Sequence, residues 1–120
     1  MAFDMTEVSD RLREIRFAES RVRIVPGYID REILNASSPA AVCFAYIDFD
    51  FYEPTLIALE FLDSTLVSGG SVVVDDYDFF STGAKTAVDE FLADRREPWQ
   101  FEQPIASAGH FCMLRRRIAG

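Results

Sequence analysis

The sequence predicts an α/β fold in which parallel strands, separated by helices, are followed by an antiparallel hairpin. Residues 41–48 and 71–76 are nearly continuous apolar runs, as expected of strands buried on both faces of a parallel sheet. Segments with apolar residues at helical spacing precede, separate and follow these runs. With 120 residues, 49% of them hydrophobic, the chain is expected to form a single domain over residues 1–120.

Three elements are predicted before the first buried strand. Residues 6–20 have apolar side chains at helical spacing, with acidic residues early and arginines later, as a helix dipole favours. The alternating run RVRIVPGY, residues 21–28, predicts a short strand that ends at its Pro-Gly pair. Residues 30–36, DREILNA, predict a brief helix, and the residues that follow predict a linker.

After the first buried strand, a helix is predicted with Pro54 in its first turn, where the missing N–H costs nothing. Gly69 and Gly70 are expected to end this helix as a C-cap, just before the second buried strand. A further helix is predicted from Ser81 to about residue 96. The runs WQFEQPI and HFCMLRRRI then predict the terminal hairpin.

Charge and cysteine content exclude several classes of function. The net charge of −8 argues against nucleic acid or an anionic membrane surface as a partner, since both attract basic patches. Arginines 115–117 are interpreted as a solvated strand end. Cys43 and Cys112 lie in apolar runs without CxxC spacing, which predicts reduced core thiols. No apolar run is long enough for a membrane span, so a cytoplasmic protein is expected.

Acidic residues follow both buried strands. Asp48 and Asp50 end the first run, and Asp75 and Asp76 end the second, with Asp78 close behind. Parallel strands deliver their carboxyl ends to one edge of a sheet, so these carboxylates are expected to converge there. Like charges so close repel unless a cation lies between them, and carboxylate oxygens suit hard ions such as Mg²⁺. The sequence therefore predicts a metal site, although an Asp-Asp pair alone is also a common turn or helix-cap device.

The segment from YIDFDFYEPT through GGSVVVDDYDFF to AVDEFL resembles the macrocin O-methyltransferase (TylF-type) family. That family has the pattern D-x-D-x-Y-E-x-T, a helix, P-G-G, a strand, D-D-Y and a helix with A-V-D-x-F. The upstream RVRIVPGYI resembles its third strand. The resemblance implies a partial Rossmann-like, class I methyltransferase sheet that lacks the first two strands. It also implies a metal-dependent transferase that uses S-adenosylmethionine (SAM) to methylate a sugar hydroxyl of a natural product.

Site residues follow from the same resemblance. Asp48, Asp75 and Asp76 match the metal ligands, for Mg²⁺ or Mn²⁺, and Asp50 matches the general base. A divalent ion that binds both oxygens of a vicinal diol lowers the pKa of the hydroxyl, and a carboxylate beside a ligand could then take the proton. The expected substrate is a sugar or glycosylated natural product, and Tyr52, Glu53 and Thr55 are expected to shape the turn and begin the helix.

The chain also departs from this family. It has no first strand, no Gly-rich cofactor turn and no acidic residue after a second strand, so its SAM-binding residues are unknown and its enzymatic activity is left open. The chain is therefore expected to be the C-terminal, metal-binding part of a methyltransferase-like fold. The alternative is a non-catalytic α/β oligomerisation module that retains the acidic motifs. Because the missing strands would leave residues 41–48 with a bare edge, a homodimer or larger oligomer is expected.

Overall fold

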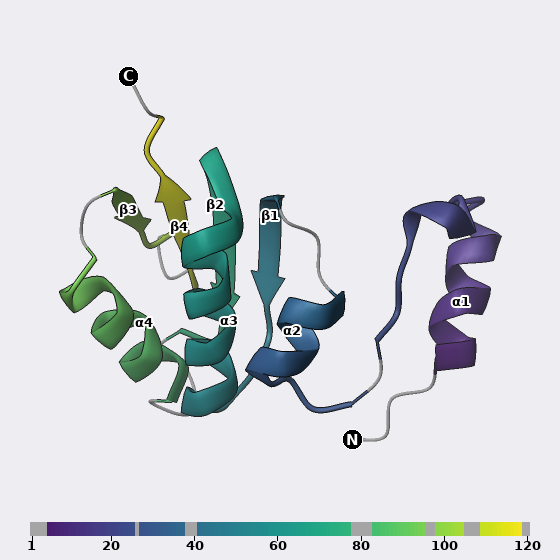
Figure 1. The fold of residues 1–120 in the computed structure, drawn as a ribbon, viewed down its shortest axis with the longest axis horizontal. Helices are drawn as coiled ribbons and strands as arrows, with labels where there is room; N and C mark the ends of the chain where they lie inside the picture. Colours follow the sequence, from purple (N-terminus) through teal and green to yellow (C-terminus); the bar gives the residue numbers. More distant parts are fainter. Residues whose placement is uncertain are drawn as a thin grey trace.

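Helices and strands alternate along most of the chain, as the sequence predicts (Figure 1). A computed structural model describes residues 5–25, 27–37, 41–77, 83–95, 98–104 and 109–118. In chain order the elements are α1 (Met5–Glu14), the short 3₁₀ helix η1 (Glu19–Arg21), α2 (Arg31–Ser37), β1 (Val42–Ile47), α3 (Tyr52–Thr65), β2 (Leu66–Asp75), α4 (Gly83–Ala93), β3 (Trp99–Glu102) and β4 (Phe111–Arg116).

The four strands form one mixed sheet in the order β1-β2-β4-β3. β1 and β2 are parallel, and β4 is antiparallel to both of its neighbours, β2 and β3. The predicted parallel pair and terminal hairpin are therefore confirmed. β4 lies between β2 and β3, so the hairpin is joined to the sheet through its second strand.

The core lies between the sheet and the helices α3 and α4, which lie together over one face of the sheet (Figure 1). Its fully buried side chains come from both layers, since Val72, Leu114 and Cys112 face Leu59 and Phe91. The longest helix, α3, has 14 residues, or about 21 Å at the usual helical rise. None of the described helices is long and apolar enough to cross a membrane.

Two predictions for the N-terminal part are corrected. The first helix ends at Glu14, because Arg16 takes a left-handed conformation (φ 59°) and Phe17 N–H donates to the carbonyl of Leu12, which is a Schellman-type stop. Residues 22–25 form no strand, although their side chains alternate between half-buried and exposed. The sequence pattern of a strand is present, but the described residues place no strand beside it to pair with.

The glycine pair also has another role than the one predicted. Helix α3 ends at Thr65, so Gly69 and Gly70 lie within β2 and do not cap the helix. The pairing of β1 with β2 is irregular here, as Leu66 is the partner of Val42 and only Ser71 onwards resumes a regular register. Gly69 has a φ of +80°, which a residue with a side chain rarely adopts. The glycines thus allow a bulge in β2.

The arginine-rich strand end is not simply solvated. Arg116 is half-buried, stacks 4.8 Å above the ring of Trp99 and lies 3.5 Å from the carboxylate of Asp63. Asp63 also accepts hydrogen bonds from Trp99 Nε1 and Arg95 Nε, both at 3.2 Å. This contact joins the end of α3 to α4, β3 and β4, so one carboxylate ties four elements together. The prediction of a solvated strand end was wrong for Arg116. Its guanidinium is partly buried because it stacks on an aromatic ring and pairs with a carboxylate.

β1 forms an edge of the sheet, as expected from its position in the predicted fold. Phe44 and Tyr46 on one face of β1 are each 57% exposed, and Cys43 on the other face is also exposed. Cys112 is buried, so the prediction of core thiols holds for Cys112 and is wrong for Cys43. Cys43 lies near the start of β1, which has a neighbouring strand on one side only, whereas Ile47 at the end of the same strand is buried.

Candidate metal centre

The parallel register of β1 and β2 sets the position of the candidate site. Ile47 pairs with Val74, so the next residues along each strand, Asp48 and Asp75, emerge side by side at the carboxyl edge of the sheet. Asp76 follows with a φ of +53°, a left-handed turn that an aspartate tolerates better than most residues. Carboxylate oxygens of Asp48, Asp75 and Asp76 all lie within 4.8 Å of one another. The structure therefore brings together the three residues predicted as metal ligands.

Asp75 is the most firmly held of the three. Its Oδ1 accepts a 2.9 Å hydrogen bond from the backbone N–H of Asp76, and its Oδ2 accepts a 2.7 Å hydrogen bond from the hydroxyl of Tyr46. Asp75 is half-buried, whereas Asp48 is exposed. The cluster is thus open to solvent on one side and fixed to the sheet on the other.

Desolvation and mutual repulsion both raise pKa values in this cluster. Desolvation and the charges of Asp75 and Asp50 raise the pKa of Asp48 above its ordinary value. Desolvation, with the charges of the other three aspartates, also raises the pKa of Asp76. The hydrogen bond to Asp75, together with desolvation and the acidic surroundings, raises the pKa of Tyr46 to about 12. A divalent cation would relieve this repulsion, because it would replace mutual repulsion by attraction to each carboxylate.

Asp50, the predicted general base, lies beside the three. It is exposed, and a side-chain hydrogen bond between Asp50 and Asp76 adds to the raised pKa of Asp76. Thr55, which is fully buried, donates from its hydroxyl to the carbonyl of Phe51 at 2.8 Å. The segment with Asp50 is therefore fixed to the first turn of α3, which agrees with the turn-shaping role predicted for Thr55.

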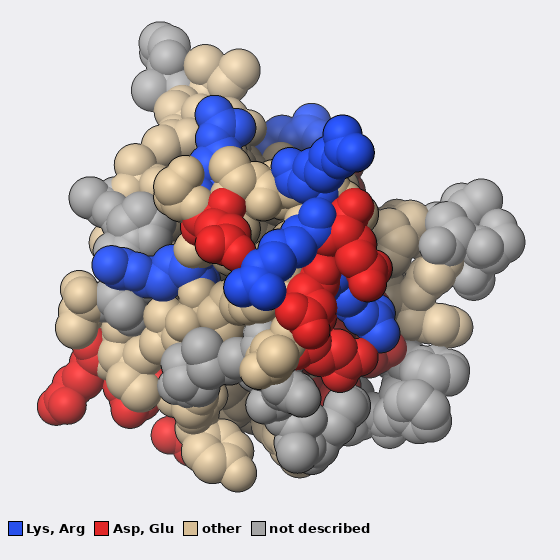
Figure 2. Space-filling view, turned by 90° about the vertical axis from the view of Figure 1, so that its right-hand side faces the viewer, with Lys and Arg blue, Asp and Glu red and all other residues tan. Residues whose placement is uncertain are grey.

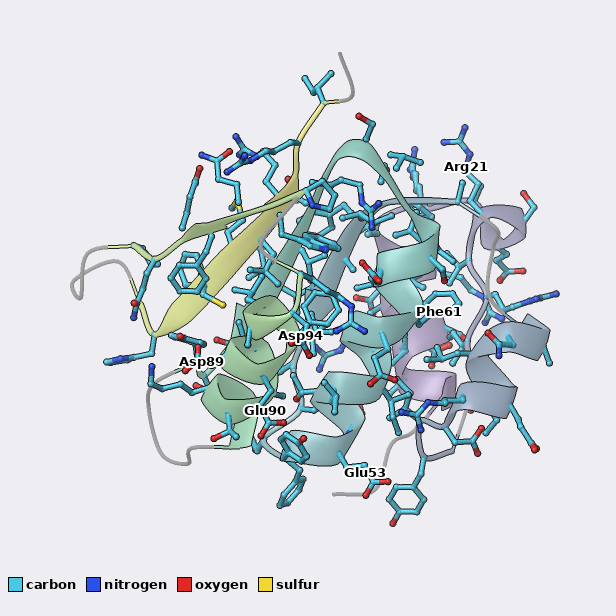
Figure 3. All side chains as sticks on the ribbon, turned by 60° about the vertical axis from the view of Figure 1, so that its left-hand side comes forward. Arg21, Glu53, Phe61, Asp89, Glu90 and Asp94 are labelled. Carbon is cyan, nitrogen blue, oxygen red and sulfur yellow. The ribbon has the colours of Figure 1, made fainter. Side chains whose placement is uncertain are left out.

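Gly83 supports the same segment from the opposite side. A Cβ added to Gly83 would lie 2.9 Å from Tyr52 N and 3.1 Å from the carbonyl oxygen of Asp50. The start of α4 thus packs backbone against backbone on the residues that follow β1, which only a glycine permits. Tyr52 adds a hydrogen bond from its hydroxyl to Glu90 on α4 (Figure 3).

Tyr77 anchors the turn after β2. It is 4% exposed, its backbone N–H donates to the carbonyl of His110 at 3.0 Å, and its ring packs on Phe101. Its hydroxyl donates to Asp89, which projects from α4 (Figure 3). The residue directly after the Asp75-Asp76 pair is therefore buried, so the pair itself must turn outward.

Sequence reasoning missed Tyr46 and Gly83. Side chains two residues apart in a strand share a face, so Tyr46 could have been placed on the side of Asp48 from its position alone. Gly83 offered no such signal, because its role depends on the approach of two segments that are far apart in the chain. Asp78, which follows the acidic pair in the sequence, and Ser81, the predicted start of the next helix, lie outside the described residues.

Charged side chains elsewhere are arranged differently. Figure 2 views the molecule from the side where α1 lies and shows basic and acidic residues interleaved. On α1, Arg11 pairs with Glu7 at 2.9 Å, and Arg13 pairs with Glu19 at 2.6 Å and with Asp10 at 3.4 Å. These acids are neutralised by neighbouring arginines, whereas no arginine or lysine pair is found for Asp48, Asp75 or Asp76 among the ion pairs of the described residues.

Known protein structures share the fold of this chain over nearly its whole length. The structure of the O-methyltransferase NovP superposes with a TM-score of 0.80 and 25% identity, over 98% of this chain and 46% of NovP. A putative rRNA-methylase from Clostridium thermocellum shares the fold, with a TM-score of 0.69 and 18% identity over 92% of this chain and 68% of that one. The strand order and the superposition on NovP thus show a class I methyltransferase-like α/β fold.

The family is identified by sequence. A model of the macrocin-O-methyltransferase (TylF) family matches residues 1–117, and the chain belongs to this family. The 8-demethyl-8-(2,3-dimethoxy-alpha-L-rhamnosyl)-tetracenomycin-C 4'-O-methyltransferase of Streptomyces olivaceus is 27% identical over 106 residues, which is 88% of this chain and 38% of that protein. The chain therefore spans less than half the length of these two relatives, NovP and the tetracenomycin enzyme.

Proposed function

We propose that this chain is the metal-binding part of a SAM-dependent O-methyltransferase that acts on a sugar hydroxyl of a glycosylated natural product. The observation that supports the proposal is the convergence of Asp48, Asp75 and Asp76 within 4.8 Å, in a member of the TylF family. The name of the 4'-O-methyltransferase relative includes a rhamnosyl group, which favours a sugar as the methyl acceptor. Three carboxylates form a suitable donor set for Mg²⁺ or Mn²⁺.

The roles of the residues follow from their positions. Asp48, Asp75 and Asp76 would hold the divalent ion at the edge of the sheet. When bound, the ion would supply Lewis-acid activation of a hydroxyl. Asp50, next to Asp76, would accept the proton of that hydroxyl, because it is an exposed carboxylate held beside the cluster by the first turn of α3.

The described residues do not provide a SAM site of the usual kind. A dinucleotide-type cofactor fold places a Gly-rich turn directly after a strand, so that backbone N–H groups approach the ligand. Residues 48–51 after β1 and 76–82 after β2 contain no glycine. We therefore assign to this chain the metal and the proton acceptor, and we assign no residue to SAM.

Calorimetric titration tests the metal role. Wild-type protein should release or absorb heat with Mn²⁺ and Mg²⁺ at a stoichiometry of about one, and Asp75→Ala should abolish the signal because it removes a central ligand. Asp94→Asn is the matched control, as it removes an exposed carboxylate just beyond the far end of α4. Equal heats in wild type and Asp75→Ala, or no heat in either, would reject the metal site.

One outcome of a calorimetric titration with SAM would exclude the non-catalytic module. Titration with SAM should give no strong heat for this chain alone, since the described residues offer no cofactor turn. Micromolar binding of SAM by the isolated chain would defeat the non-catalytic alternative and would require a cofactor site among other residues.

We also propose that the edge of β1 pairs with a second copy of the chain. An apolar edge strand with exposed Phe44 and Tyr46 is a template for strand pairing, and a symmetric dimer is the commonest way to cover it. Light scattering coupled to size exclusion should give about twice the 13.6 kDa mass of the chain. A monomer at micromolar concentration would reject this arrangement.

A further inference from the structure

We propose that Tyr46 is a positioning residue that orients the carboxylate of Asp75 toward the divalent cation. The inference rests on the metal role proposed above and extends it to a side chain that neither the family pattern nor the acidic motif includes.

The sheet places Tyr46 and the acidic cluster on one face. In the parallel register, Tyr46 pairs with Val73 and Ile47 pairs with Val74. Partners across a strand pair share a face, and so do residues two apart along a strand. Tyr46 and Asp48 of β1 therefore lie on the same face as Asp75 of β2, which brings the phenol hydroxyl within 2.7 Å of Asp75 Oδ2.

This contact completes the fixation of Asp75. Its Oδ1 is already held by the N–H of Asp76, so the bond from Tyr46 to Oδ2 leaves the carboxylate little freedom to rotate. A carboxylate has about four lone-pair sites on its two oxygens, and these two hydrogen bonds occupy two of them. The remaining sites are available to a cation shared with Asp48 and Asp76.

Packing does not explain the position of the hydroxyl. The side chain of Tyr46 lies at the sheet edge and is 57% exposed, so its location depends on the bond to Asp75 more than on neighbours in the core. Hydrogen bonds to metal ligands orient the ligand atoms, and their loss typically costs about tenfold to a hundredfold in metal affinity. Tyr46→Phe removes only the hydroxyl and keeps the ring.

The first measurement is the dissociation constant of Mn²⁺ by calorimetry, with the unfolding temperature of the metal-free protein measured in parallel. We expect Tyr46→Phe to weaken Mn²⁺ binding about tenfold or more and to leave the metal-free unfolding temperature nearly unchanged. Tyr52→Phe is the matched control, because it removes another phenol hydroxyl from another carboxylate, Glu90, that is not one of the three converging aspartates. Its Mn²⁺ affinity should equal that of wild type.

A second measurement reports on the hydrogen bond itself. Cation binding withdraws charge from the oxygen that accepts the Tyr46 hydroxyl, so wild-type protein should show a tyrosine difference spectrum in the near ultraviolet when Mn²⁺ is added. The spectrum should persist in Tyr52→Phe and vanish in both Tyr46→Phe and Asp75→Asn. The presence or absence of this spectrum in wild-type protein and in Tyr52→Phe tests the Tyr46 hydrogen bond even if Tyr46→Phe does not fold.

The outcomes are distinct. Mn²⁺ binding by wild type with an unchanged dissociation constant in Tyr46→Phe, or without a tyrosine signal, overturns the positioning role and leaves the metal site standing. Absence of Mn²⁺ binding in wild type overturns both proposals.

Discussion

The hydroxyl of Tyr77 donates a 2.6 Å hydrogen bond to Oδ1 of Asp89, and this bond joins the turn after β2 to the middle of α4. Lys85 lies over the Tyr77 ring at 4.8 Å and pairs with Asp89 at 3.3 Å, so the three side chains form one network. Because Tyr77 directly follows Asp75 and Asp76, the network fixes the end of the acidic motif from the core side.

Tyr77→Phe tests this network through stability. It removes a hydrogen bond to a charged acceptor while keeping the buried ring, so we expect a loss of about 1 kcal/mol in the free energy of unfolding by urea at neutral pH. Thr86→Ala, an exposed change on the same helix, is the control and should have little effect. An unchanged free energy of unfolding in Tyr77→Phe would show that the hydroxyl is not needed to anchor the turn.

The same residue predicts a pH dependence. Burial, with the hydrogen bond to Asp89, raises the pKa of Tyr77 to about 12, although Lys85 opposes the shift. A group whose pKa is raised in the folded state contributes stability that is present below its unfolded pKa, about 10 for tyrosine, and is lost as the pH rises toward 12. Unfolding midpoints measured from pH 9 upward should fall more steeply in wild type than in Tyr77→Phe. Parallel curves of unfolding midpoint against pH for the two proteins would contradict the raised pKa of Tyr77.

Asp63→Ala should be among the more destabilising single changes on the surface. It leaves the N–H of the buried Trp99 without its acceptor and removes the partner of Arg95 and Arg116. An unsatisfied buried donor costs about 1–3 kcal/mol, so we expect a loss of about 2 kcal/mol by urea unfolding. Asp94→Ala, an exposed aspartate at the end of α4, should stay within about 0.5 kcal/mol of wild type.

Gly83→Ala distinguishes close packing from helix propensity. In an open helix, alanine in place of glycine stabilises by up to about 1 kcal/mol. Here the new Cβ would meet backbone atoms of Tyr52 and Asp50 at 2.9 and 3.1 Å, and backbone cannot move aside as a flexible side chain can. We therefore expect destabilisation of about 1–3 kcal/mol in urea unfolding. If Gly83→Ala stabilised the protein, α4 would not pack closely against the segment that carries Asp50.

Asp76→Asn should stabilise the metal-free protein and weaken metal binding at once. The change removes one of three mutually repelling carboxylates, and asparagine tolerates the left-handed φ of +53° at this position. Thermal unfolding with EDTA should therefore give a higher midpoint for Asp76→Asn than for wild type. Saturating Mn²⁺ should reduce or reverse the difference, and an equal difference under both conditions would argue against a shared cation.

Much of the candidate site could be predicted because strand ends in a parallel sheet meet at one edge. Asp48 and Asp75 follow buried strands, and the register of Ile47 with Val74 places them side by side without further information. The residues that support these carboxylates were harder to predict. Tyr46 contacts Asp75, which is 29 residues away in the sequence, and Gly83 acts only because α4 approaches the segment after β1. Sequence spacing places Tyr46 on the same strand face as Asp48, but it does not reveal the contact with Asp75 or the approach of α4.

The errors in the fold have a common physical origin. Residues 22–25 alternate like a strand, yet a strand exists only where a neighbour satisfies its N–H and C=O groups. Cys43 lies in an apolar run but on an edge strand, so its apolar surroundings are incomplete. Gly69 looked like a helix cap because glycine favours positive φ in both settings, and the bulge in β2 uses the same property.

A crystal structure with Mn²⁺ would test the metal centre most directly, because manganese can be located by its anomalous scattering. We expect one anomalous peak at the carboxyl edge of β1 and β2, with oxygens of Asp48, Asp75 and Asp76 all within coordinating distance, about 2.0–2.3 Å. The Tyr46 hydroxyl should remain bonded to Asp75 and lie outside the coordination shell. The absence of a peak at this edge, or a manganese ion bound without Asp75, would contradict the proposed metal centre.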